Sequence, residues 1–156
     1  MGGAVTTGIH NIAIGSNSTD AVTTGAHNVA IGRHTLSGST TGCKNVAIGH
    51  TALGGTDTTG IDNIAIGTNT MDNMVTGFEN IALGNNSMGA AQCGSYNIAI
   101  GENPLDALTT GLCNVAIGRN ALGASTTGCL NVAIGELALG TGVTTGSQNV
   151  AIGCGA

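Results

Sequence analysis

The chain alternates short apolar triplets with polar, glycine-rich links at a spacing that barely changes. Each triplet reads Val or Ile, then Ala, then Ile or Leu, and stands between an asparagine and a glycine. Repetition at 17 or 18 residues over the whole chain predicts a repeat protein in which each copy packs on its neighbours. The nine asparagines are Asn11, Asn28, Asn45, Asn63, Asn80, Asn97, Asn114, Asn131 and Asn149.

Each triplet predicts a short strand. Its first and third residues lie two positions apart, so they share one face of a strand, and β-branched residues dominate both positions. Two glycines in every repeat disfavour helical hairpins. The sequence therefore predicts one all-β domain over residues 1–156, a parallel β-solenoid (β-roll) of nine turns uncapped at both ends. Turns stacked about 4.8 Å apart would form a rod on the order of 43 Å long.

The repeat also predicts what fills and shapes each turn. We expect the Val, Ile and Leu columns of the triplets to face the interior, together with a third apolar column. The asparagines are expected to form a ladder at a corner, and the glycines to occupy corners of positive φ or close backbone approach. The third apolar column consists of Leu36, Leu53, Met71, Met88, Leu105, Leu122 and Leu139.

The central alanine of the triplet is open to two interpretations. It points away from the Val/Ile face, and no polar residue replaces it in any repeat. Alanine either fits a tight layer inside the same coil or packs against a neighbouring chain as a lateral interface. The residues of this column are Ala13, Ala30, Ala47, Ala65, Ala82, Ala99, Ala116, Ala133 and Ala151.

Composition excludes several classes of function. The chain has 28 glycines, one Phe, one Tyr and no Trp, so a round core built on aromatic rings is excluded. Three basic side chains and a net charge of −5 argue against nucleic-acid binding. No apolar run is long enough for a transmembrane helix, so membrane insertion is not expected. The first residues lack the charged and apolar regions of a signal peptide.

Candidate chemical sites are few. His10 and His27 share a column on adjacent turns, but two stacked imidazoles lack the third ligand that a metal needs. The five cysteines show no CxxC spacing, so we expect free thiols, with one available for an intermolecular bond. The aspartates of the links, including Asp57, are not expected to recur in one column. The sequence predicts no catalytic residue, no metal site and no cofactor.

Paired threonines suggest a rival function. Thr-Thr precedes the repeat glycine in seven of the nine repeats, and flat threonine ladders on solenoids can bind ice. Adjacent threonines in an extended segment point to opposite sides, however, which leaves only one outward ladder. Ice binding is therefore the second alternative to a structural role.

Residues 40–53, Thr-Thr-Gly-Cys-Lys-Asn-Val-Ala-Ile-Gly-His-Thr-Ala-Leu, resemble the repeats of two families. One is the heads of trimeric autotransporter adhesins, and the closer one is bacteriophage tail fibres that carry an endosialidase-type chaperone. The resemblance implies a parallel β-roll, often trimeric, that serves as a stiff adhesive or spacer fibre. It also implies an extracellular filament or a virion fibre. The adhesin repeat is usually shorter than this one.

The spacing across the chain ends suggests self-assembly. If a second copy followed the first, Asn149 and the next Asn11 would lie 18 residues apart, a spacing that also occurs inside the chain. We therefore expect head-to-tail stacking into a filament, with a fragment of a longer fibre as the alternative. The expected junction consists of Met1, Ile12, Ile14, Val150, Ile152 and Gly153.

Overall fold

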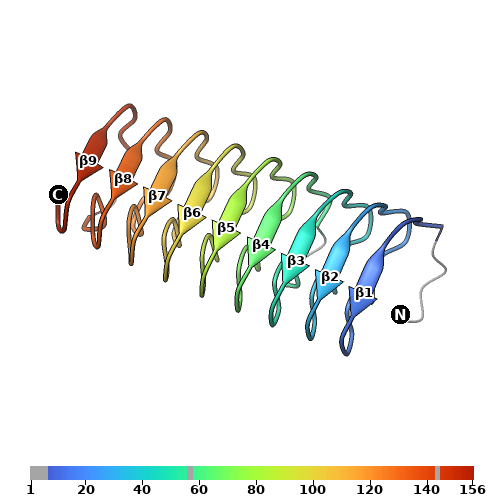
Figure 1. The fold of residues 1–156 in the computed structure, drawn as a ribbon. Coiled ribbons are helices and arrows are strands. Elements are labelled where there is room, and N and C mark those ends of the chain that lie inside the picture. The colour runs from blue at the N-terminus through green and yellow to red at the C-terminus, as the bar shows by residue number, and fades with distance from the viewer. Residues whose placement is uncertain (1–6, 56–57, 143–144) are drawn as a thin grey trace.

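The computed structural model describes residues 7–55, 58–142 and 145–156, which form a rod of stacked coils (Figure 1). Each coil contributes one strand of three residues, and no helix occurs in the described ranges. The all-β prediction is confirmed. The strands are β1 (Ile12–Ile14), β2 (Val29–Ile31), β3 (Val46–Ile48), β4 (Ile64–Ile66), β5 (Ile81–Leu83), β6 (Ile98–Ile100), β7 (Val115–Ile117), β8 (Val132–Ile134) and β9 (Val150–Ile152).

All nine strands belong to one parallel sheet, ordered as they occur in the chain. Equivalent positions of the repeat pair with each other, as in Val29 with Val46 and Ala30 with Ala47. The same register holds between β3 and β4, whose repeat is one residue longer, so the link absorbs the extra residue. This is the parallel β-solenoid that the repeat predicts.

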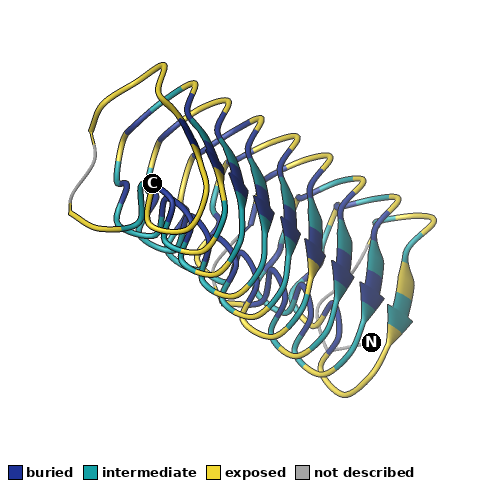
Figure 2. Cartoon of the chain, turned by 60° about the vertical axis from the view of Figure 1, so that its left-hand side comes forward, coloured by how far each residue is buried: buried dark blue, intermediate teal, exposed yellow. Residues whose placement is uncertain are grey.

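The alanine at the centre of each strand points into the coil. From β2 to β8 these alanines are 0% exposed, whereas the residues on either side of them are partly exposed (Figure 2). One expectation is thereby corrected, and of the two interpretations of the alanines the structure supports packing inside the same coil. The Val/Ile/Leu pair of each triplet faces outward, and the alanines Ala13, Ala30, Ala47, Ala65, Ala82, Ala99, Ala116, Ala133 and Ala151 lie on the inner face of their own coil.

The reason for this orientation is the narrow interior of the coil. The predicted Leu/Met column does face inward, with Leu36 and Leu105 fully buried, and it already supplies a large side chain in most turns. Small buried residues such as Ser87 and Ala121 fill the position just before it. Two more β-branched side chains in every turn would overfill a layer of this size.

A further buried column was not predicted. Val22, Met74, Ala91 and Leu108 occupy equivalent positions in the links and are almost fully enclosed. Other turns place Ser39 or a similar small polar residue there, and its hydroxyl bonds to backbone, as Ser39 does to the carbonyl of Thr58. Because both apolar and polar residues occur in this column, the sequence does not show that it points into the coil.

The glycine after each strand is required by close approach of the next turn. These glycines have φ between 125° and 141°, and a Cβ on Gly84 would lie 1.8 Å from the carbonyl oxygen of Gly101. The expectation of glycines at corners of positive φ is confirmed here. Left-handed backbone also occurs at many other residues, including the buried Leu105 at φ 51°, where a side chain costs conformational energy.

Candidate functional site

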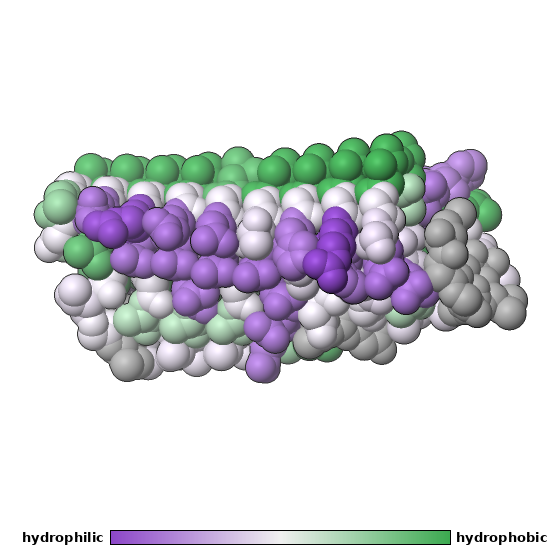
Figure 3. Space-filling view, turned by 90° about the horizontal axis from the view of Figure 1, so that it is seen from below, coloured by the Kyte–Doolittle hydropathy of each residue, from purple (hydrophilic) through white to green (hydrophobic). Residues whose placement is uncertain are grey.

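A continuous apolar strip runs the length of the rod, and we call it the aliphatic face. It is formed by the first and third residues of all nine strands and appears as an unbroken green row in Figure 3. In the middle of the rod, Ile66 remains 37% exposed. The face consists of Ile12, Ile14, Val29, Ile31, Val46, Ile48, Ile64, Ile66, Ile81, Leu83, Ile98, Ile100, Val115, Ile117, Val132, Ile134, Val150 and Ile152.

The size of the aliphatic face follows from strand geometry. Nine strands about 4.8 Å apart and three residues wide give a flat footprint of roughly 400 Å². Soluble monomers rarely expose a contiguous apolar patch larger than a few hundred Å². No position of the face carries a polar or charged side chain, so it offers no chemistry for catalysis or metal binding. The aliphatic face is instead suited to pack against another apolar surface.

The asparagine ladder predicted from the repeat is confirmed, and it fastens each turn to the next. The backbone N–H of Asn97 donates to Oδ1 of Asn80 at 3.0 Å, and that of Asn114 donates to Oδ1 of Asn97 at 2.9 Å. Nδ2 of Asn97 donates to the carbonyl of Gly111 at 2.9 Å. The inner asparagines are almost completely buried, so their amides provide the hydrogen bonds that the corner backbone cannot obtain from water.

The end strands carry most of the residues expected at a filament junction. Ile12 and Ile14 of β1 are 52% and 58% exposed, and Val150 and Ile152 of β9 are 71% and 68% exposed. Each of these strands pairs on one side only, with β2 and with β8. Gly153 follows β9 with a φ of 129°, as its equivalents do. Met1 lies outside the described residues.

The histidines lie as the repeat predicts. The rings of His10 and His27 stack with centroids 4.9 Å apart, and both residues are exposed. Within the ranges that the structure describes, no three His, Cys, Asp or Glu side chains are grouped to hold a metal ion. On the other side of the strands, Arg119 and Glu136 form an ion pair at the surface. The hydrogen bond and the charge of Glu136 raise the pKa of Arg119 above its ordinary value.

All five cysteines are free, as the spacing predicts, and two of them have a structural role. Sγ of Cys43 accepts a hydrogen bond from the N–H of Ala26, and Sγ of Cys129 accepts one from Leu112, both at 3.4 Å. Ser95 occupies the same repeat position, and its hydroxyl accepts from the N–H of Phe78 at 3.2 Å. The thiols of Cys43 and Cys129 therefore replace a serine hydroxyl.

The threonine pairs separate into an inner and an outer file. In the inner file, hydroxyls bond to the next turn, as Thr23 and Thr109 do to the carbonyls of Thr40 and Thr126, both at 3.0 Å. The outer file is exposed, which agrees with the expectation of a single outward ladder. Its described members are Thr7, Thr24, Thr41, Thr59, Thr76, Thr110, Thr127 and Thr145.

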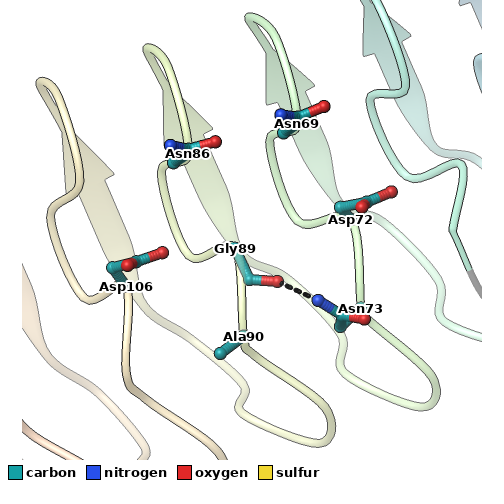
Figure 4. Close-up of a pocket in the computed structure, with 7 residues that line it drawn as sticks. All are labelled: Asn69, Asp72, Asn73, Asn86, Gly89, Ala90 and Asp106. Carbon is teal, nitrogen blue, oxygen red and sulfur yellow. Dashed lines mark hydrogen bonds between the residues drawn. The ribbon is translucent and has the colours of Figure 1, made fainter.

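A shallow polar depression of about 300 Å³ lies on the side of the rod formed by the links (Figure 4). Asp72 and Asp106 flank it from turns on either side of Gly89, and Nδ2 of Asn73 donates to the Gly89 carbonyl at 2.7 Å. Asp20, Asp72 and Asp106 occupy the same position of the repeat. The expectation that the aspartates do not share a column is thus wrong for these three, while Asp57 lies outside the described residues.

The two carboxyls of the depression are expected to destabilise the fold at neutral pH. Burial raises the pKa of Asp72 and of Asp106, and a hydrogen bond from Gly55 and the charge of His50 oppose this for Asp72. A carboxyl whose pKa is higher in the folded chain than in the unfolded chain stabilises the fold at a pH below its ordinary pKa of 3.8. This stabilisation is lost as the pH rises through the pKa of the folded chain.

Asp72→Asn and Asp106→Asn should therefore each raise stability at pH 7 by roughly 0.2–0.5 kcal/mol, a small gain because solvent screens half-exposed groups. The gain should vanish below pH 3.8. Chemical denaturation at several pH values measures it, with Asp62→Asn at an exposed position as the control for loss of one negative charge. An equal gain at every pH would show that desolvation of these carboxyls is not the cause.

Comparison with known proteins finds no match to a family model, a curated protein or a solved structure. Within the described residues, no helix is both long and apolar enough to cross a membrane.

Proposed function

We propose that the chain is a structural fibre subunit whose copies associate side by side through the aliphatic face. The observation that carries this proposal is the unbroken row of eighteen aliphatic side chains on one side of the rod. A sheet face open to water normally carries polar side chains that alternate with the buried ones. Aliphatic residues on both sides of the strand are typical of a sheet that is covered on both faces.

The free energy available from the aliphatic face favours association. Two copies that cover each other's aliphatic face remove roughly 800 Å² from water, a gross gain of about 20 kcal/mol at 25 cal/mol per Å². Lost rotational and translational freedom and ordering of side chains oppose this by about 4–15 kcal/mol. The remaining free energy favours association. The residues that provide it are those of the aliphatic face, and not the alanines that the sequence offered as a lateral contact.

Two arrangements satisfy the proposal. Two copies can pack face to face, or three copies can turn their faces towards a common axis. The second arrangement is the one expected from the resemblance to tail fibres and adhesin heads, and a stiff extracellular spacer or attachment fibre is the function that it supports. In either arrangement the protein acts through shape and self-association, without a chemical step.

Head-to-tail stacking is the axial part of the proposal. The open edges of β1 and β9 present strand groups and aliphatic side chains that a second copy would cover. The ladder supports such a contact because it is directional: each turn donates from its N–H to the asparagine of the turn before. In negative-stain electron microscopy, rods longer than about 43 Å are expected if the ends join.

A double variant of the aliphatic face tests the lateral contact. Ile81→Glu with Ile98→Glu should reduce the mass per unit rod length, measured by light scattering and electron microscopy, to that of a single file of chains, because two carboxylates cannot be buried in an apolar interface. Far-UV circular dichroism should be unchanged, because both side chains lie outside the coil. Head-to-tail stacking is assessed separately in the same samples, from rod length.

The control is Thr76→Glu with Thr110→Glu, which adds the same two charges at exposed positions away from the face, on the turn of Ile81 and on the turn after that of Ile98. This variant should keep the parent mass per unit rod length. If the Ile81→Glu, Ile98→Glu variant also kept the parent mass per unit rod length, the aliphatic face would not be the contact. A parent that is a monomer at all concentrations would equally contradict the proposal, and ice binding by the outer threonine file would then be the function to assay.

A further inference from the structure

A second group of exposed apolar side chains lies beside the aliphatic face. It belongs to the corner that precedes each strand, and this corner is exposed along the rod (Figure 2). We call the two residues before each asparagine the leading rim. In the turns of β4 to β8 this rim presents a set of apolar residues that we call the rim patch. It consists of Ile61, Phe78, Tyr96, Leu112 and Leu130, which are 45%, 37%, 47%, 42% and 52% exposed.

The centre of the rim patch is an aromatic pair. Phe78 and Tyr96 are the only phenylalanine and the only tyrosine of the chain, and their rings meet edge to face with centroids 5.0 Å apart. The backbone of Phe78 also bridges to that of Ile61 in the turn before. Exposed aromatic residues held by such contacts have the properties of interface hot spots, since little freedom is lost when they are covered.

The aliphatic face alone cannot align two copies along the rod. Its residues repeat in every turn, so a slip by one turn, about 4.8 Å, restores the same contacts and loses only those at the end. Slipped pairs would leave aliphatic strips uncovered and recruit further copies in an open, staggered array. A defined assembly through this face needs residues that differ from turn to turn.

The leading rim is such a feature. Its turns before β1 to β3 carry His10, His27 and Lys44 together with the exposed Ile9, whereas the later turns carry the rim patch, with Asp62 and Glu79 beside its first two residues. The opposite rim, formed by the residues after the strand glycines, is mostly polar or charged, including Arg33, Glu102 and the Arg119–Glu136 pair. Figure 3 shows this polar border alongside the aliphatic face.

The footprint of the aliphatic face also requires a contribution from a rim. Stable interfaces bury about 800 Å² on each partner, about twice the roughly 400 Å² that nine three-residue strands provide. The rim patch gains more from being covered than the polar rim on the opposite side. We propose that the rim patch contacts the neighbouring copy of this chain and sets the axial register of the assembly. The proposal rests on the lateral association described above.

Disulfide cross-linking between turns tests the register directly. The five native cysteines are replaced by serine, which retains the hydrogen bonds of positions 43 and 129 in the way Ser95 does. Single cysteines on the face are then mixed in pairs and oxidised, because a disulfide forms only when two Cα atoms lie about 4.4–6.8 Å apart. The substitutions are Ile81→Cys, Ile98→Cys, Val115→Cys, Leu83→Cys, Ile100→Cys and Ile117→Cys.

When the rim patch is intact, the cross-link yield between one pair of turns should exceed the yield between neighbouring pairs by about tenfold or more. A preference of this size is what aromatic hot spots can provide. Phe78→Ser with Tyr96→Ser should spread the yield over several turn offsets while the chain still associates. Ile9→Ser is the matched control: it removes an exposed apolar residue of the same rim outside the patch, and it should keep the parent pattern.

The outcomes separate the two proposals. Cross-links spread evenly over offsets in the parent, or one unchanged offset in the Phe78→Ser, Tyr96→Ser variant, would overturn the role of the rim patch and leave lateral association intact. A parent that associates without any cross-link on the face, or that is a monomer, would overturn lateral association and the register proposal with it.

Discussion

Replacement of Ala99 by glutamate is expected to abolish the folded rod. Ala99 is 0% exposed at the centre of β6, and its neighbours in the column are the equally buried Ala82 and Ala116. Glutamate there would bury a carboxylate without a partner and force a larger side chain into a closely packed layer. We expect a loss above about 4–5 kcal/mol, within the range of the whole stability of a domain. Circular dichroism and thermal unfolding measure it.

The control for Ala99→Glu is the next residue towards the N-terminus. Ile98→Glu carries the same charge on the same strand but points outward, so its monomer should unfold close to the parent temperature. This pair of substitutions separates the two faces of the strand in a single turn. If Ala99→Glu left the secondary structure intact and Ile98→Glu destroyed it, the inward and outward assignments of the triplet would have to be exchanged.

The repeat predicted the fold but not the direction of the strand side chains. Alternation shows that Ile98 and Ile100 share one face and Ala99 the other, and it says nothing about which face is inside. Apolar character favoured the larger residues for the interior. The volume of the coil decides otherwise, because Leu105 fills the same layer and leaves room only for a methyl group. That volume depends on the width of the turn, which no single repeat specifies.

The other parts of the candidate site differ in how far the aligned repeats predict them. The asparagine ladder could be predicted because every repeat keeps the residue, and a buried corner needs an amide that both donates and accepts. The rim patch could not, since Phe78 and Tyr96 occur once each and lie in different columns. The shared column of Asp72 and Asp106 was missed because Gly89 stands between them.

The face and the ladder have distinct roles in the proposed fibre. The ladder, the strand glycines and the inward alanines act within the chain, where they hold each turn against the next. The aliphatic side chains contribute less to the fold, since they remain partly exposed, and their proposed effect is on association. Substitutions can therefore remove assembly without unfolding, or unfold the rod outright, according to the side of the strand on which they fall.

The asparagine ladder is expected to be the most sensitive polar element of the rod. Asn97→Ala leaves the buried N–H of Asn114 and the carbonyl of Gly111 without their partner, and Asn80 loses one donor. Each buried orphan costs about 1–3 kcal/mol, so the variant should lose about 2–6 kcal/mol of unfolding free energy. Because turns in a solenoid are stabilised by their nearest neighbours, the loss should also uncouple the turns on either side of β6.

Denaturant unfolding followed by circular dichroism measures this loss, and a broadened or two-step transition would report the uncoupling. Asn97→Asp is informative, because it keeps the acceptor for Asn114 but loses the donor to Gly111 and buries a charge, so it should also be destabilised at neutral pH. Gln148→Ala, which removes an exposed amide, should stay within about 0.5 kcal/mol of the parent. If Asn97→Ala were as mild as Gln148→Ala, the backbone and interior alone would hold the turns together, and the ladder would be a consequence of the stacking rather than a cause of it.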